Sequence, residues 1–314
     1  MDVAIIYHPD CALHDTGGYH PERPERTVAI VERLRESPLN EQLIWHLAET
    51  VDLAHVEAVH DASYVRRIEE ACLQGREALD HGDTHICPDS FAVARLSAGG
   101  AVQAVDLVMQ GEANAAFSVM RPPGHHAEQA EAMGFCLFNN VAVAARYAQQ
   151  EYDLERVAII DFDVHHGNGT QAIFYRDPSV FFVSLHQFPF YPGTGSKREA
   201  GEGEGIGFTL NVPLPAGARY DEYETAWREE ILPALTEFQP ELILISAGFD
   251  AHANDPLANM LLRSEDYYSL TKEVVHFAQQ SCDGRIVSVL EGGYNLEALA
   301  ESAEAHVRGL CDGK

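Results

Sequence analysis

The sequence predicts an α/β fold in which a mostly parallel central sheet is covered by helices on both faces. Short apolar runs rich in β-branched residues alternate along the chain with longer patterns of helical periodicity. Continuous apolar strands separated by helices are typical of parallel sheets that are buried on both sides. The 314 residues contain no internal repeat, low-complexity tract or long linker, so we expect a single domain over residues 1–314.

Seven strands and seven helices are expected from the periodicity. The strands cover residues 3–7, 115–120, 157–161, 180–185, 208–212, 242–247 and 286–290. The helices cover residues 24–35, 62–73, 90–110, 141–150, 220–238, 265–280 and 296–310. Ser90 is a favourable N-cap for the third helix, and Gly111 is a favourable stop after it.

The charge balance is strongly acidic and excludes two classes of partner. Lys and Arg give 21 positive charges against 49 negative charges from Asp and Glu, a formal net charge of −28. Sequence-independent binding to nucleic acid requires basic surface, and so does docking on an anionic membrane. We therefore expect no nucleic acid and no membrane as partners, whereas a cationic substrate is compatible with the chain.

Cysteine usage and the apolar runs predict a reduced, cytoplasmic protein. The six cysteines are scattered and show neither zinc-finger spacing nor a disulfide framework. The first residues, MDVAIIYH, lack the basic region and the long apolar stretch of a signal peptide. No run approaches 18 apolar residues, so no membrane-spanning helix is expected.

The most informative polar residues follow four of the predicted strands, at the point where each strand ends. In chain order, these segments read RPPGHH at 121–126, DFDVHHGNG at 161–169, SAGFD at 246–250 and EGGY at 291–294. Ligands of open α/β sheets bind in the crevice beyond the carboxyl ends of the strands. The sequence therefore predicts a functional site at this edge of the sheet.

Asp163, His165 and Asp250 form the candidate metal site. Asp163 and His165 are two residues apart on an extended segment, so their side chains point to the same side, and Asp250 adds a third ligand from another strand end. Two carboxylates and one imidazole leave a position open, as a hydrolytic metal requires. Zinc fits best, although these ligands also suit Fe(II) or Co(II). The alternative is that Asp163 and His165 only cap a helix or pair with arginine.

His125 and His126 form the candidate acid–base pair. They follow Pro122-Pro123-Gly124, which restricts the backbone before them. Two histidines on a stiffened loop at a strand end are typical of proton transfer. Asp161 and Asn168 are expected to orient the two imidazoles. A carboxylate stabilises imidazolium, whereas an amide mainly fixes the tautomer, so the histidine paired with asparagine exchanges a proton more freely near neutrality.

Tyr294 is the candidate oxyanion donor. It follows two glycines, so its phenol can sit on a mobile loop over the metal and donate to a developing negative charge. Considered without its neighbours, this residue would be interpreted as an ordinary core or surface tyrosine.

These motifs, taken in order, resemble the zinc-dependent histone deacetylase family. The segments that carry the resemblance are RPPGHH at 121–126, GFCLFNN at 134–140, DFDVHHGNGTQ at 161–171, SAGFDA at 246–251 and LEGGYN at 290–295. Asn168 and HPERPER at 20–26 are similar to the class II branch, and the compact length resembles the bacterial histone deacetylase-like amidohydrolases. The resemblance spans nearly the whole chain and implies an arginase-like, three-layer α/β fold.

The resemblance also implies a role for each site residue. It places one zinc ion on Asp163, His165 and Asp250, with His126 as general base and then acid, and Tyr294 polarising the acyl carbonyl. His125, hydrogen-bonded to Asp161, is then an electrostatic partner. The acyl-lysine channel is implied at Gly134, Phe135 and Tyr191, a rim contact at Asp83, and an inner acetate cavity at Arg26. A structural potassium is implied at Asp161, Asp163, His165, Ser184 and Leu185, and a second monovalent cation at Phe174, Asp177, Val180 and Phe208.

Leu257 lies where relatives that select polyamines carry a carboxylate. Leucine cannot pair with a second ammonium, so acyl-lysine in a peptide or protein is favoured over a small acetylated amine. One buried charge-assisted contact is worth roughly 1.5–3 kcal/mol, or about 10- to 150-fold in binding. The alternatives are an acetylpolyamine deacetylase, a binuclear manganese ureohydrolase and a catalytically idle acyl-lysine or polyamine binding protein. A homo-oligomer remains possible.

Overall fold

The polar segments that follow the strands meet at one edge of an eight-stranded sheet. The computed structural model describes residues 2–80 and 82–313. The strands lie in the order β2-β1-β5-β10-β9-β6-β7-β8, and each pair of neighbours is parallel. Their bounds are β1 Val3–Tyr7, β2 Leu43–Leu47, β5 Ala115–Ser118, β6 Val157–Asp161, β7 Val180–Gln187, β8 Thr209–Leu214, β9 Leu242–Ala247 and β10 Ile286–Leu290.

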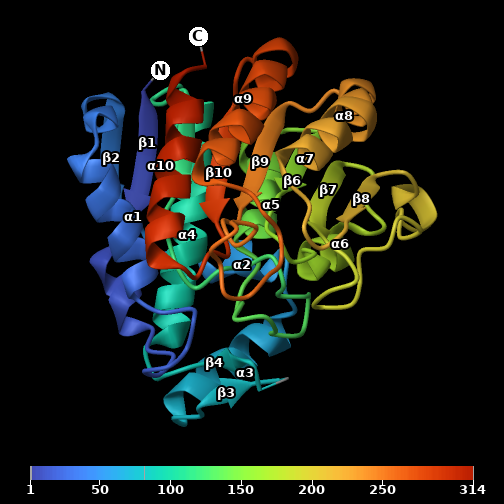
Figure 1. Cartoon of the computed structure of the whole chain (residues 1–314). Coiled ribbons are helices and arrows are strands. Elements are labelled where there is room, and N and C mark those ends of the chain that lie inside the picture. Colours follow the sequence, from blue (N-terminus) through green and yellow to red (C-terminus); the bar gives the residue numbers. More distant parts are fainter. Residues whose placement is uncertain (1, 81, 314) are drawn as a thin grey trace.

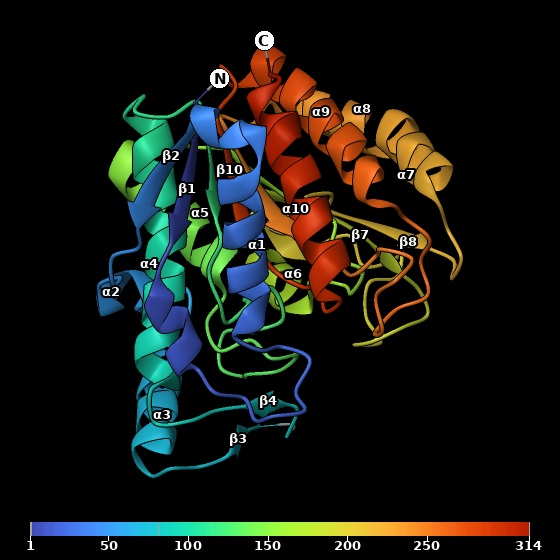
Figure 2. The ribbon, with the colours of Figure 1, turned by 60° about the vertical axis from the view of Figure 1, so that its left-hand side comes forward.

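Helices cover both faces of this sheet, as Figures 1 and 2 show. The helices with α1, on one side, are α1 Glu25–Glu36, α7 Tyr220–Ala226, α8 Leu232–Phe238, α9 Ser264–Ser281 and α10 Leu296–Cys311. Those with α4, on the other side, are α2 Leu53–Glu57, α3 Ala62–Leu73, α4 Ser90–Met109, α5 Asn140–Tyr152 and α6 Asn168–Phe174. Short 3-10 turns occupy Pro9–Leu13, Pro38–Gln42 and Gly203–Gly205.

Alternation along the strands builds a separate apolar core on each face. Val3 and Ile5 of β1 belong to the core beneath α1, α9 and α10, whereas Ala4 and Ile6 belong to the core beneath α4 and α5. Successive side chains of a strand point to opposite faces, so a strand covered on both sides is apolar throughout. The three-layer α/β architecture predicted from the sequence is confirmed.

The elements that differ from the prediction are short or interrupted. Periodicity missed the edge strand β2, whose burial is only partial, and the short helices α2 and α6. The helix predicted over 220–238 is interrupted by a π-helical turn, Trp227–Ile231. Pro233, in the first turn of α8, has no backbone N–H to donate, so the regular ladder changes register there.

Helix α4 is the one helix among the described residues that is long and apolar enough, by length and composition only, to cross a membrane. Its most hydrophobic window has a mean hydropathy of 1.3, but 78% of that window is buried within the fold. It packs against α5 and β5. The surrounding protein thus accounts for its apolar character, as in the central helix of a core.

The four strands that lead into the polar segments are neighbours in the centre of the sheet. The order β5-β10-β9-β6 brings their carboxyl ends side by side, although the strands are far apart in sequence. The register pairs Asp161 at the end of β6 with Ser246 on β9 and with Ser184 on β7. In Figure 1 these ends point downwards, towards the small antiparallel hairpin of β3 Ala78–Leu79 and β4 Thr84–His85.

Candidate active site

Asp163, His165 and Asp250 converge at the carboxyl edge of the sheet. Each offers one ligand atom, these atoms all lie within 4.8 Å of one another, and the three residues are buried. His165 Nδ1 is 3.1 Å from Asp163 Oδ1 and 3.1 Å from Asp250 Oδ2. A single imidazole N–H cannot point squarely at both oxygens. Three ligand atoms this close together, from two carboxylates and an imidazole, match the chemistry of a divalent cation site.

The other carboxylate oxygens are held by the backbone. Gly292 donates its N–H to Asp163 Oδ2 at 2.7 Å, and Val164 donates to Asp250 Oδ1 at 2.9 Å. The carboxylates also approach Gly292 and Gly248 more closely than any side chain would permit. A Cβ on Gly292 would lie 2.1 Å from Asp250 Oδ2, and one on Gly248 would lie 2.2 Å from Asp163 Oδ2. The glycines of the SAGFDA and LEGGYN motifs therefore make room for the carboxylates.

His125 and His126 lie beside this cluster, and each contacts the partner expected for it. Asp161 Oδ2 is 2.9 Å from His125 Nδ1, and Asn168 Oδ1 is 2.8 Å from His126 Nδ1. The two imidazole centroids are 4.0 Å apart. Because the amide oxygen of Asn168 accepts a hydrogen bond, His126 carries its proton on Nδ1, and Nε2 is left with a free lone pair.

The environments of the two histidines shift their pKa values in opposite directions. Burial opposes the charged form of His125, but the carboxylates of Asp161 and Asp163 outweigh it and raise the pKa of His125 well above its usual value. Burial and the neighbouring charge of His125 lower the pKa of His126 well below its usual value. These shifts favour the charged form of His125 and the neutral form of His126.

Sequence reasoning missed two acidic residues that orient these histidines. Glu128 Oε1 accepts a hydrogen bond from Asn168 Nδ2 at 2.9 Å, which keeps the amide oxygen directed at His126. Glu291 Oε2 accepts the backbone N–H groups of Gly124 at 2.7 Å and His125 at 3.1 Å. Burial raises the pKa of Glu291 to about 7. Glu128 lies two residues after RPPGHH and Glu291 lies inside LEGGYN, but neither position by itself indicates a role.

A cavity of about 270 Å³ leads to the cluster. Its lining residues are Asp83, His126, Gly134, Phe135, His165, Phe190, Tyr191, Leu257 and Tyr294. Every residue expected in the channel is present, and Phe190, adjacent to Tyr191, is the wall residue that sequence reasoning missed. Phe190 stacks on the imidazole of His165 with the ring centroids 5.5 Å apart.

Tyr191 and Asp83 are joined across the mouth of the cavity. The phenol of Tyr191 donates to Asp83 Oδ2 at 2.9 Å, and the same oxygen accepts the N–H of Gly134 at 3.2 Å. A phenylalanine in place of Tyr191 could not make the first of these bonds. The carboxylate of Asp83 is thereby fixed at the cavity entrance, between the 134–135 and 190–191 walls.

Tyr294 lines the cavity, and the buried Arg26 lies against its ring. The Arg26 guanidinium carbon is 4.9 Å from the centroid of the Tyr294 ring. Burial raises the pKa of Tyr294 well above its usual value although Arg26 opposes this, so the phenol stays protonated and able to donate. Arg26 donates to the carbonyls of Gly293 at 2.6 Å and Glu291 at 2.5 Å and to Glu22 at 3.2 Å. Arg26, which is expected at an acetate cavity, therefore also holds the loop that carries Tyr294.

The residues expected to hold monovalent cations lie in two separate places. Ser184 pairs with Asp161 in the sheet register, and its hydroxyl is 2.9 Å from His186 Nδ1. The second group lies where α6 ends and β7 begins, and the N–H of Asp177 donates there to the carbonyl of Phe174 at 3.0 Å. The carbonyl of Phe208 accepts the N–H of Phe182 at 2.9 Å. These contacts are compatible with the expected cation sites but do not require them.

Comparison with known proteins decides the family. The histone deacetylase domain model matches residues 20–310. The chain belongs to the histone deacetylase family. The histone deacetylase-like amidohydrolase of Pseudomonas aeruginosa is 44% identical over 88% of this chain and 73% of its own length. The human polyamine deacetylase HDAC10 is 38% identical over 96% of this chain and 47% of its own.

A solved structure of the family has the same fold. The crystal structure of an HDA15 HD domain superposes with a TM-score of 0.93 at 35% identity, and the match covers 99% of this chain and 88% of that one. The family resemblance inferred from the motifs is therefore confirmed. The chain therefore has both the fold and the ordered motifs of the histone deacetylase family.

Proposed function

We propose that this protein is a zinc-dependent deacetylase that removes acetyl groups from Nε-acyl-lysine. The observation that carries the proposal is that the candidate ligand His165, the base His126 and Tyr294 line one cavity. A group that binds metal, a group that accepts a proton and a group that donates to an oxyanion are together sufficient for amide hydrolysis.

The cluster of Asp163, His165 and Asp250 fits zinc. The set, one imidazole and two carboxylates whose ligand atoms lie within 4.8 Å of one another, matches a catalytic site with a position left for substrate. A zinc ion held there supplies Lewis-acid polarisation of the acyl carbonyl. Among the described residues, one group of three candidate ligands is found. We therefore assign one ion per chain rather than the binuclear manganese centre of a ureohydrolase.

The side chains around this cluster supply the proton transfers. His126, neutral and with Nε2 free, takes a proton from the attacking water and later delivers it to the leaving amine. His125 remains cationic beside Asp161 and stabilises the negative charge that develops on the acyl group. Tyr294 donates a hydrogen bond to the same oxygen. A protein that only binds acyl-lysine needs none of these proton transfers. The alternative of a catalytically idle binding protein is therefore disfavoured.

The cavity walls favour acyl-lysine as the substrate class. Phe135, Tyr191 and Leu257 provide apolar surface for the lysine methylenes, and Asp83 at the entrance offers acceptors to the substrate backbone. A second candidate is an acetylated polyamine, which is supported by the relative named as a polyamine deacetylase and by the carboxylate of Asp83. Leu257 weighs against it, because leucine cannot pair with a second ammonium.

We also infer a structural potassium beside the active site. Asp161, Asp163 and His165 would contribute carbonyl oxygens, with Ser184 and Leu185 from β7. The second monovalent cation at Phe174, Asp177, Val180 and Phe208 belongs to the same proposal. The protein is further proposed to act in the cytoplasm.

Turnover of a substrate panel tests the proposed substrate class. We expect the zinc-loaded enzyme to hydrolyse an acetyl-lysine peptide with a higher kcat/KM than acetylputrescine or acetylspermidine. Leu257→Glu adds a carboxylate to the cavity wall. It should raise kcat/KM for the acetylated polyamines by about 10-fold or more relative to the peptide, because one charge-assisted contact is worth that much. Hydrolysis of acetylspermidine in preference to every peptide by the unmodified enzyme would reverse the assignment.

A further inference from the structure

Asp255 is a buried carboxylate to which the proposed chemistry gives no role. It lies in the loop after β9, five residues beyond Asp250, and its exposed fraction is 8%. Among residues 2–80 and 82–313, no lysine, arginine or histidine forms an ion pair with it. A carboxylate removed from water without a cationic partner is costly, so the hydrogen bonds it makes instead require explanation.

Backbone N–H groups from two cavity loops satisfy this carboxylate. Oδ2 accepts the N–H of Tyr294 at 2.7 Å and, more weakly, that of Asn295 at 3.4 Å. Oδ1 accepts the N–H of Leu257 at 2.9 Å. Tyr294 and Leu257 both line the cavity, so Asp255 joins the loop that bears the phenol to its own loop, which bears the wall residue Leu257.

The backbone before Tyr294 needs such an anchor. Gly292 and Gly293 precede it, and Gly293 has a φ of +119°, a conformation that glycine adopts without strain. Helix α10 begins at Leu296, directly after the loop. The N–H of Gly292 binds Asp163 and the carbonyl of Gly293 binds Arg26, so Asp255 is the group that fixes the peptide of Tyr294 itself.

We propose that Asp255 is a positioning residue for deacetylation, which holds the backbone of Tyr294 so that its phenol lies over the reacting carbonyl. This rests on the proposed function. Asp255 itself touches no reacting atom and acts through Tyr294. A displacement of about 1 Å in a catalytic group can cost on the order of 100-fold in rate, so loss of the anchor should be visible in kcat.

A double-mutant cycle between Asp255→Asn and Tyr294→Phe separates positioning from general structural damage. Asn replaces one carboxylate oxygen by an N–H₂ group, which cannot accept from one of the two loops. We expect Asp255→Asn to lower kcat on an acetyl-lysine peptide by on the order of 10- to 100-fold in the unmodified enzyme. In the Tyr294→Phe background, the same change should lower kcat by less than about 3-fold, because the donor that Asp255 positions is already gone.

Two further measurements keep the test decisive. Hydrogen exchange at the Tyr294 amide should accelerate in Asp255→Asn, with zinc content unchanged. Asp52→Asn is the matched control, since Asp52 also accepts a backbone N–H, from Ala54 at 2.9 Å, but at an exposed helix start outside the cavity. Its turnover and exchange at Tyr294 should match the unmodified enzyme. If Asp255→Asn does not fold, Asp255→Glu, which displaces the carboxylate by one methylene, takes its place in the cycle.

The results that would overturn the inference are distinct from those that would overturn the proposed function. An equal loss of kcat in both backgrounds, or unchanged kcat and exchange in Asp255→Asn, would mean that Asp255 does not act through Tyr294. An unmodified enzyme inert towards acylated lysine, or one unaffected by Tyr294→Phe, would instead remove the proposed function. The exchange measurement would still report whether Asp255 holds the loop.

Discussion

Asn168 determines which nitrogen of His126 is free for proton transfer. Its oxygen accepts from Nδ1, and its amide nitrogen is held by Glu128, so the ring is fixed with Nε2 as the base. His125 is paired with a carboxylate instead. The two histidines therefore differ mainly in their partner, an amide for His126 and a carboxylate for His125. This difference makes His126 the base and His125 the cation.

This difference predicts a pH effect for Asn168→Asp. The general base must be neutral, so kcat/KM falls as the pH drops through the pKa of His126, which lies below its usual value in the native site. A carboxylate at 168 stabilises the charged imidazole and raises that pKa, by roughly 1 unit or more. The acid limb of the kcat/KM profile should therefore move to higher pH.

The control for this prediction is Asn40→Asp. Asn40 also accepts an N–H from a ring, Trp45 Nε1 at 2.8 Å, but it is exposed and lies outside the cavity. Its profile should superimpose on that of the unmodified enzyme. An acid limb that stays in place in Asn168→Asp would show that His126 is not the titrating base.

The sequence predicted which residues could do chemistry, but it did not predict which residues hold them in place. The residues of the candidate site could be recognised from the sequence, because few structural roles require such side chains directly after buried strands. They are Asp163, His165, Asp250, His125 and Tyr294. Glu291 and Asp255 are acids that bind backbone N–H groups from distant loops, and a linear sequence does not show which loops will meet.

At the scale of elements, the sheet order explains why the site forms. The four strands β5, β10, β9 and β6 are adjacent, and the loops after them contribute the histidines, Tyr294, Asp250 and the Asp163–His165 pair. Apolar runs predicted that these strands exist, and the rule for carboxyl ends predicted a shared edge. Their order, and the edge strand β2, depend on long-range packing that periodicity does not encode.

The loop after β10 leaves no room for a side chain at Gly292, and this predicts the effect of Gly292→Ala. The added Cβ would lie 2.1 Å from Asp250 Oδ2 and 2.5 Å from Asp163 Oδ2, so a ligand carboxylate must move. We expect zinc affinity to fall by about 10- to 100-fold or more, the size seen when groups that orient metal ligands are lost. Zinc binding measured by competition with a chelator reports this directly, independently of turnover.

Gly18→Ala is the matched control, because a Cβ on Gly18 meets nothing within 4 Å and its φ is not in the left-handed region. It should bind zinc as the unmodified enzyme does. Equal zinc affinity in Gly292→Ala would contradict the placement of the two carboxylates.

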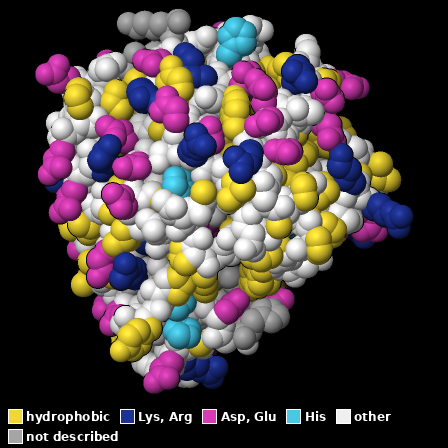
Figure 3. Space-filling view, in the orientation of Figure 1, with side chains coloured by type: hydrophobic (Ala, Val, Ile, Leu, Met, Phe, Trp, Pro, Cys, Tyr) yellow, Lys and Arg dark blue, Asp and Glu magenta, His cyan; other side chains and the backbone are white. Residues whose placement is uncertain are grey.

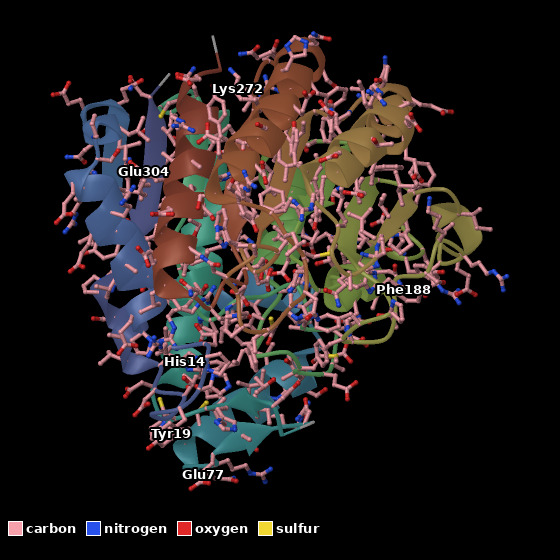
Figure 4. All side chains as sticks on the ribbon, viewed as in Figure 1. His14, Tyr19, Glu77, Phe188, Lys272 and Glu304 are labelled. Atoms are coloured by element: carbon pink, nitrogen blue, oxygen red, sulfur yellow. The ribbon has the colours of Figure 1, made fainter. Side chains whose placement is uncertain are left out.

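At the scale of the whole molecule, the acidity and the position of the site are compatible with a cationic substrate. Acidic side chains are spread among basic ones over the face in Figure 3, and the formal net charge is −28. In Figure 4, His14, Tyr19 and Phe188 lie towards the end where the strands finish, whereas Lys272 lies at the opposite end. A negative field of this kind concentrates cationic peptides, more so at low ionic strength.

We propose that residues 1–314 form one domain, because strands from both halves of the chain share one sheet. Strand β1, near the start of the chain, pairs with β5, and β5 pairs with β10, near its end. Arg26 of α1 reaches the carbonyls of Glu291 and Gly293 beside Tyr294. Segments from both ends of the chain therefore build the same site, which a division into two domains would separate.

The measurement that tests the central claim most directly is a titration of metal-free enzyme with zinc, with acetyl-lysine turnover followed at each step. We predict that turnover rises in proportion to zinc and reaches its plateau at one equivalent per chain, and that Asp250→Ala neither binds zinc nor turns over. A plateau at two equivalents, or a fully loaded enzyme inert towards every acylated amine, would contradict the account.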